Sequence, residues 1–229
     1  MPSSELWPKA VLFDLDGTLA DSFPAITRAL NLALEEGRMP LRELAWVRRH
    51  VGRGALALVT DAVPRGSSAD LVQATAEVFA RHYRAIYLDE SPPLPGAAEV
   101  LALVASRTGG KAGVVSNKIS ALCGAWLDHW GLARYIAAVS GPDTAGVHKP
   151  DRGAVLPILQ ELGVRPASAL MVGDLAIDAA TGQAAGIPVV LVADEPGLGA
   201  ALEGAGARAV LQTLFELPGW LAANGRGWE

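Results

Sequence analysis

The stretch from Ala10 to Ser22 constrains the fold of this chain more than any other part of the sequence. Its first four residues, Ala10–Phe13, are apolar and predict a short buried strand. Four polar or small residues follow closely: Asp14, Asp16, Gly17 and Thr18. Glycine permits a sharp turn at this point, and carboxylates at the carboxyl end of a parallel strand lie where open α/β sheets bind ligands. An Asp-Gly turn with solvated carboxylates is the alternative, so the rest of the chain has to decide between them.

The sequence after this strand predicts a helical insertion. Ser22 is a suitable N-cap for a helix that has Pro24 in its first turn. From about residue 41 to residue 90 the apolar residues recur at helical spacing, without strand-like alternation. The proline-rich segment Ser91–Gly96 then forms a stiff hinge. We therefore predict a core made of residues 1–22 and 93–229, and a helical domain made of residues 23–92.

Beyond Gly96, strand-like and helix-like segments alternate. The predicted strands are Ala112–Val115, Ile136–Ser140, Ala169–Val172 and Pro188–Val192, with an edge strand at Ala209–Leu211. Helical segments such as Val155–Leu162 separate them. This alternation is typical of a parallel sheet with helices on both faces. The predicted fold class is therefore α/β, a doubly wound parallel sheet with a helical domain inserted after the first strand.

The composition excludes several classes of function. Hydrophobic residues make up 51% of the chain, which is enough for a substantial core. The net charge of -5, without any run of lysine or arginine, argues against a nucleic-acid partner. No apolar stretch approaches the roughly 20 residues that span a bilayer, so no membrane partner is expected. The single cysteine, Cys123, and the lack of a signal-peptide pattern predict a cytoplasmic protein.

Polar side chains recur at or just beyond the ends of the predicted strands. They are Asp14 and Asp16, then Ser116-Asn117-Lys118, then Lys149, and finally Asp174 with Asp178. Parallel strands bring their carboxyl ends to one edge of a sheet, where crowded carboxylates require a cation such as Mg²⁺. A lysine beside them suits a phosphoryl group. An aspartate can attack phosphorus to give an aspartyl-phosphate, and a second carboxylic acid can protonate the leaving oxygen and then activate water.

These residues resemble, in order and spacing, the four motifs of the haloacid dehalogenase-like hydrolase superfamily. The matching segments are Asp14-Leu15-Asp16-Gly17-Thr18-Leu19, Ser116-Asn117-Lys118, Lys149-Pro150 and Gly173-Asp174-x-x-x-Asp178. The resemblance covers nearly the whole chain, and the helical insertion looks like the C1-type cap of that superfamily. Three segments resemble its phosphoglycolate phosphatase group: Val51–Ala55, Val115–Lys118, and Gly141–Thr144 leading to Lys149-Pro150-Asp151.

The resemblance implies a role for each motif residue. Asp14 is the nucleophile and a Mg²⁺ ligand, and Asp16 is the general acid/base whose backbone carbonyl also binds the metal. Ser116 and Lys149 hold the phosphoryl group. The remaining metal residues are Asp174, a Mg²⁺ ligand, and Asp178, which supports the metal's water shell. Since true dehalogenases lack an aspartate at the position of Asp16, the resemblance implies phosphoryl transfer.

Five further residues are predicted to bind substrate: Gly17, Thr18, Arg53, Asn117 and Lys118. Asn117 is expected to shape the phosphate loop. Lys118 is either a phosphate or carboxylate contact or a solvated lysine at a helix start. Arg53 lies between two glycines just before a helical run, where a guanidinium and free backbone N–H groups suit a small carboxylate. The alternative is a surface arginine in a turn.

The predicted function is a Mg²⁺-dependent phosphatase for a small phosphorylated metabolite, with 2-phosphoglycolate as the leading substrate. A phosphosugar phosphatase, or a phosphotransferase or mutase on the same scaffold, is an alternative, and a non-catalytic binding module is another. Leu175 is the one departure from the motif pattern, because many relatives have a hydroxyl residue there. That leaves the support of Asp174 in question. The chain is expected to be a monomer or a homodimer.

Overall fold

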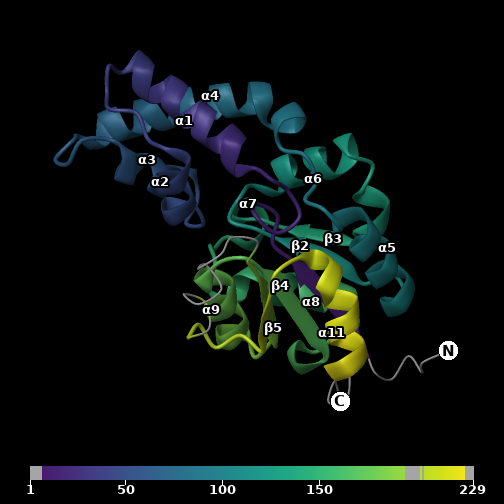
Figure 1. Cartoon of the computed structure of the whole chain (residues 1–229). Helices are drawn as coiled ribbons and strands as arrows, with labels where there is room; N and C mark the ends of the chain where they lie inside the picture. Colours follow the sequence, from purple (N-terminus) through teal and green to yellow (C-terminus); the bar gives the residue numbers. More distant parts are fainter. Residues whose placement is uncertain (1–6, 194–201, 203, 225–229) are drawn as a thin grey trace. The chain divides into compact units, whose positions relative to one another are not determined.

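The computed structural model describes residues 7–193, 202 and 204–224 (Figure 1). Its contacts divide the chain into two compact units. The first combines Met1–Ala20 with Pro93–Glu229, and the second is Asp21–Pro92. The polypeptide therefore leaves the first unit soon after its first strand and returns to it near Pro93.

The first unit contains a parallel sheet of six strands. The strands are β1 (Ala10–Phe13), β2 (Ala112–Val115), β3 (Ala138–Ser140), β4 (Ala169–Gly173), β5 (Val189–Val192) and β6 (Ala209–Leu211). Their order across the sheet is β3-β2-β1-β4-β5-β6, and every neighbouring pair is parallel. β1 therefore lies between β2 and β4, and the predicted doubly wound α/β fold is confirmed.

Helices pack on both faces of this sheet. They include α5 (Ala97–Thr108), α6 (Ser120–His129), α8 (Leu156–Leu162), α9 (Ala176–Ala185) and α11 (Leu217–Asn224). α5 contacts β1 and β2, whereas α8 contacts β3, and α9 contacts β4 and β5. Ala10 and Leu12 of β1 join Ile158 and Leu159 of α8 in one buried cluster. Since successive side chains of a strand point to opposite faces, the fully buried run at β1 requires cover on both sides.

The second unit consists of helices alone. They are α1 (Phe23–Glu36), α2 (Leu44–His50), α3 (Ala55–Ala62) and α4 (Ala69–Glu90). α4 packs against α1 and α3, and its rings Phe79, Tyr83 and Tyr87 recur every four residues and are buried. The spacing stacks neighbouring rings, with centroids 5.7 Å and 5.3 Å apart. Among the residues described in either unit, no helix has the length and apolar character needed to cross a membrane.

Three predicted details differ from the structure. β3 begins at Ala138, not at Ile136, because a short 3-10 helix at Ala133–Tyr135 precedes it, although Ala137 N–H already donates to Ala112 O at 2.8 Å. β5 begins at Val189, after Pro188, which has no N–H for a ladder. Ser22 stands at the N-cap of α1, but its φ of -90° and ψ of -16° are helical and its side chain makes no capping hydrogen bond.

Candidate active site

The parallel strand order brings the predicted site residues of the first unit to one edge of the sheet. Asp14 follows β1, and its N–H donates to Val172 O of β4 at 2.9 Å. Ser116 follows β2, and its N–H donates to Ser140 O of β3 at 3.0 Å. Asp174 follows β4 directly. The backbone hydrogen bonds at Asp14 and Ser116 therefore continue one residue beyond the strands. Because β1 lies between β2 and β4, the side chains that follow these three strands begin at neighbouring strand ends.

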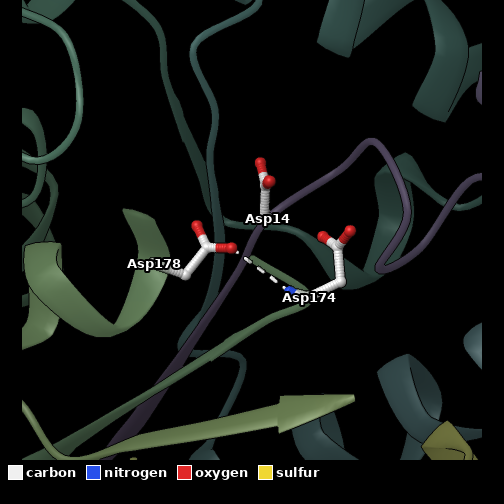
Figure 2. A group of neighbouring side chains, drawn as sticks. All are labelled: Asp14, Asp174 and Asp178. Atoms are coloured by element: carbon white, nitrogen blue, oxygen red, sulfur yellow. Dashed lines mark hydrogen bonds between the residues drawn. The ribbon is translucent and has the colours of Figure 1, made fainter. Parts of the chain in front are cut away.

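Three carboxylates form a buried cluster at this edge (Figure 2). Asp14, Asp174 and Asp178 each offer an oxygen within 4.8 Å of the other two. Asp14 and Asp174 come from the ends of adjacent strands, and Asp178 comes from the first turn of α9. Their exposed fractions are 5%, 4% and 0%. Like charges held so close, away from water, oppose one another's ionisation.

The ionisation of two of these groups reflects that crowding. Burial raises the pKa of Asp14 to about 6; repulsion from Asp178 and Asp16 adds to the rise, and attraction by Lys149 counters it. Burial, followed by repulsion from Asp178 and Asp14, raises the pKa of Asp174 well above its ordinary value. The cluster therefore needs more positive charge than its lysine supplies.

Lys149 is the ammonium group within the cluster. Its Nζ lies 2.9 Å from Asp14 Oδ1 and donates a hydrogen bond of 2.7 Å to Asp178 Oδ1. Burial alone would lower the pKa of Lys149, but attraction to Asp14 and Asp178 outweighs it and raises the pKa above its ordinary value. The lysine is therefore charged and points at the predicted nucleophile.

Asn117 fixes the backbone that carries this lysine. Its amide Nδ2 donates to Lys149 O at 3.1 Å, and Lys149 N–H donates to Asn117 Oδ1 at 2.7 Å. This reciprocal pair ties the loop after β2 to the segment that holds Lys149. Both described hydrogen bonds of the Asn117 side chain go to protein backbone, as expected of a residue that shapes this loop.

Asp178 both caps α9 and joins the carboxylate cluster. Its Oδ2 accepts hydrogen bonds from Asp174 N–H at 3.2 Å and Leu175 N–H at 3.0 Å. Its other oxygen accepts from Lys149. Gly173 makes this possible, because a Cβ there would lie 2.3–2.4 Å from the Asp178 side chain. A helix cap and a place in the cluster are therefore two functions of one carboxylate.

Thr18 supplies a hydroxyl to Asp174. Its Oγ1 donates to Asp174 Oδ1 at 2.9 Å, and the residue is fully buried. The turn that carries it depends on Gly17, which has a φ of 88°. The sequence suggested a contact of Thr18 with substrate, but its described partner is Asp174. Position 175 carries a leucine without a hydroxyl, but Asp174 still has a supporting hydroxyl, which comes from Thr18.

Asp16 and Lys118 form a second charged pair at the same edge. Lys118 Nζ donates to Asp16 Oδ1, and the two side chains are 8% and 14% exposed, lysine first. Lys118 N–H also donates to the Ser116 hydroxyl at 3.3 Å. Ser116 and Lys118, two residues of the predicted motif after β2, are therefore in contact. The low exposure of its side chain shows that Lys118 is not a solvated lysine.

Asp143, which was not among the predicted site residues, holds the loop that carries Ser116 and Lys118. Its carboxylate accepts from Ser120 N–H at 2.7 Å and Ser120 Oγ at 2.6 Å. These hydrogen bonds outweigh its slight burial and lower the pKa of Asp143. Gly141 lies close to the backbone of the same loop, because a Cβ at position 141 would be only 2.6 Å from Lys118 O and from Ser120 N. The sequence pattern Gly141-Pro142-Asp143 could be recognised along the chain. The contact of Asp143 with Ser120 could not.

Arg53 belongs to the helical unit and not to the sheet edge. Its guanidinium pairs with Asp61 of α3, and its side chain is 58% exposed. α3 begins two residues later, at Ala55, as the sequence predicted. A substrate contact of Arg53 stays a prediction.

The donor set at the sheet edge suits a divalent cation. It offers carboxylate oxygens, the ligands that hard cations prefer. Asp14 Oδ1 is buried and, although close to Lys149, has no aligned hydrogen-bond partner among the described residues. The formal charges at this edge do not balance. Two ammonium groups, those of Lys118 and Lys149, face four carboxylates, those of Asp14, Asp16, Asp174 and Asp178, which leaves two negative charges. One divalent cation would neutralise them, and Asp14, Asp174 and Asp178 could hold it.

Solved structures share this fold over nearly their whole length. A predicted phosphoglycolate phosphatase from Haemophilus somnus superposes with a TM-score of 0.85 at 21% identity, covering 96% of this chain and 99% of the other. A predicted phosphatase from Clostridium acetobutylicum gives a TM-score of 0.83 at 21% identity, covering 95% and 99%. These likenesses define the architecture of the chain.

Sequence relatives define the family. The model of the haloacid dehalogenase-like hydrolase family matches residues 8–186. The phosphoglycolate phosphatase of Rhodospirillum rubrum is 40% identical over 93% of this chain and 91% of its own length, and that of Caulobacter vibrioides is 37% identical over 91% and 88%. The chain belongs to the haloacid dehalogenase-like hydrolase superfamily, in its phosphoglycolate phosphatase-like group.

Proposed function

We propose that this chain is a Mg²⁺-dependent phosphatase that hydrolyses 2-phosphoglycolate. The observation that carries the proposal is the charge arrangement at the sheet edge. Asp14, Asp174 and Asp178 form a buried cluster with Lys149, and a further carboxylate, Asp16, belongs to the same edge. The relatives named phosphoglycolate phosphatase support the choice of substrate.

The reaction consists of two displacements at phosphorus. In the first, an Asp14 oxygen bonds to phosphorus, the bond to the ester oxygen breaks, and a proton from Asp16 goes to the departing alcohol. In the second, Asp16 takes a proton from water, whose oxygen bonds to phosphorus. The bond to Asp14 breaks, and inorganic phosphate leaves. Asp14 thus regains its carboxylate after each turnover.

The other polar groups bind and orient the phosphoryl group. Lys149 lies 2.9 Å from Asp14 Oδ1, so its ammonium can bind phosphoryl oxygens next to the attacking atom. The Ser116 hydroxyl is buried at the end of β2 and offers a second donor. A divalent cation held by Asp14, Asp174 and Asp178 would offset the charge of the phosphoryl oxygens. Mg²⁺ is proposed because all its ligands would be oxygens.

Asp16 is the residue that favours phosphatase chemistry over dehalogenation. A halide is a stable anion and leaves without a proton, whereas an alkoxide leaves poorly unless an acid protonates it. Asp16 supplies a carboxyl group two residues after the proposed nucleophile. A carboxylic acid at this place is therefore useful for an ester substrate and superfluous for a haloacid.

The helical unit, Asp21–Pro92, is proposed to act as the cap that selects the leaving group, as the resemblance to C1-type caps implies. Its Arg53 is a candidate contact for an anionic leaving group. A cytoplasmic location and a monomeric or homodimeric state are likewise proposed, and the single cysteine supports the former.

A panel of phosphate monoesters assayed with and without Mg²⁺ tests the proposed function. Release of inorganic phosphate from 2-phosphoglycolate should exceed release from hexose phosphates, and Asp14→Asn should abolish it. Asp128→Asn is the matched control, because Asp128 is an exposed residue of α6. Transfer of phosphate to a sugar hydroxyl in place of water would indicate a phosphotransferase. No turnover of any ester would indicate a binding module.

A further inference from the structure

Two lysines are paired with carboxylates at the charged edge of the sheet, one with each part of the site. The Lys149 side chain is 1% exposed and contacts Asp14 and Asp178. The Lys118 side chain is 8% exposed and contacts Asp16. One ammonium group therefore stands beside the proposed nucleophile, and the other stands beside the proposed acid. In a phosphate ester these two positions correspond to the phosphoryl group and to the leaving group.

The loop that carries Lys118 is held from several sides. Lys118 N–H donates to the Ser116 hydroxyl at 3.3 Å. Asp143 binds both the N–H and the hydroxyl of Ser120, two residues further along. Gly141, directly after β3, lies so close to Lys118 O that a Cβ at position 141 would clash with it. A surface lysine would not need a support of this kind, so the fold holds this ammonium group in a defined place close to Asp16.

We propose that Lys118 binds the carboxylate of the substrate's leaving group and thereby selects esters of 2-hydroxy acids. The inference rests on the proposed phosphatase function. An acid that protonates the ester oxygen must lie within hydrogen-bond distance of it. Lys118 donates to that same acid, Asp16. In 2-phosphoglycolate a single methylene group separates the ester oxygen from the carboxylate carbon, so the carboxylate reaches the ammonium beside Asp16.

The chemistry of lysine permits both contacts at once. An ammonium group has three N–H donors, so one lysine can contact more than one carboxylate, and Asp16 is one such partner of Lys118. A charged donor also gains strength when the ligand excludes water. A buried ion pair by itself adds little to stability, because desolvation offsets the attraction. Recognition of a second carboxylate would give Lys118 a function that its pair with Asp16 alone does not.

A pair of nearly isosteric substrates separates recognition of charge from general damage. The first is 2-phosphoglycolate, and the second is its amide, 2-phosphoglycolamide, which has the same shape without the carboxylate charge. For Lys118→Met, kcat/KM should fall on the acid by about 10- to 100-fold more than on the amide. Most of the selective loss should be in KM. Lys118→Arg should restore part of the preference, because it keeps the charge.

The control variant is Lys9→Met. Lys9 is exposed and precedes β1, so it lies at the opposite end of that strand from Asp14. Its ratio of acid to amide turnover should equal that of the wild type. p-Nitrophenyl phosphate serves as a third substrate, because it reports phosphatase activity without any carboxylate.

The outcomes distinguish the inference from the proposed function. If the wild type hydrolyses p-nitrophenyl phosphate but does not distinguish the acid from the amide, the phosphatase function stands and the inference is wrong. An equal loss on both substrates in Lys118→Met would make Lys118 a positioning residue for Asp16 only, which also overturns it. If the wild type hydrolyses none of the three esters, the proposed function itself fails. Selective loss on the acid supports the inference.

Discussion

Replacing Asp14, the proposed nucleophile, should stabilise this protein in the absence of metal. Burial and neighbouring carboxylates raise the pKa of Asp14 from 3.8 to about 6. A difference of that size between the folded and unfolded chains corresponds to about 3 kcal/mol of the free energy of unfolding. An asparagine side chain cannot ionise, so the Asp14→Asn variant avoids this cost. For a chain of this length the gain corresponds to an increase in Tm of about 6–12 °C.

The sign of the effect gives the prediction its pH dependence. Between pH 3.8 and about 6 the folded protein keeps the Asp14 proton that the unfolded chain has lost. The folded state then binds more protons, so wild-type stability falls as pH rises through this window and stays lower above it. The advantage of Asp14→Asn should therefore be small near pH 4 and complete by about pH 7.

Urea unfolding in the presence of a chelator, at a series of pH values, measures this difference. Asp128→Asn, on the exposed surface of α6, controls for the loss of a negative charge. Added Mg²⁺ should stabilise the wild type more than the variant and narrow the gap, because ligand binding stabilises the folded state that holds it. A variant that is less stable than the wild type at pH 7, or a gain that does not change with pH, would refute the reasoning.

Three further predictions concern activity. Removing divalent cations with a chelator should lower kcat at least about 100-fold, and Mg²⁺ should restore it; full turnover in the chelator would contradict the metal role. Asp16→Asn should slow alkyl esters by about 100-fold or more and p-nitrophenyl phosphate much less, because only the poor leaving group needs an acid; equal losses would argue against that role. Arg53→Ala should lower kcat/KM for 2-phosphoglycolate about 10-fold and leave p-nitrophenyl phosphate nearly unchanged; no effect would make Arg53 a surface residue paired with Asp61.

The sheet and the place of the charged groups could be predicted because both follow from local patterns. Short apolar runs ending in polar residues define β1, β2 and β4, and parallel strands have to present those ends at one edge. The alternation of strands with helices supplies the parallel arrangement. The exact residues at which the strands begin were harder to predict. β3 and β5 begin later than predicted, because a 3-10 turn and Pro188 interrupt the backbone ladder without interrupting the apolar pattern.

Partners across long sequence distances could not be predicted from such patterns. Asn117 binds the backbone of Lys149, 32 residues away, and Lys118 pairs with Asp16, 102 residues away. The spacing of these residues identifies each as polar and near a strand end, but the choice of partner depends on side-chain direction in the folded chain. Asp178 illustrates the same limit. The resemblance implies a metal-site residue, whereas in the fold one of its oxygens accepts from Lys149 and the other accepts from the backbone at the start of α9.

Leu175 shows why a departure from a motif has to be judged in three dimensions. Along the sequence, the missing hydroxyl leaves Asp174 without a neighbour that could orient it. In the fold, Thr18 from the turn after β1 donates to Asp174 across 156 positions of sequence, because β1 and β4 are adjacent strands. The backbone N–H of Leu175 meanwhile donates to Asp178, a contact for which the side chain is irrelevant. The carboxylate cluster therefore depends on the strand order and on Thr18, and it tolerates leucine at position 175.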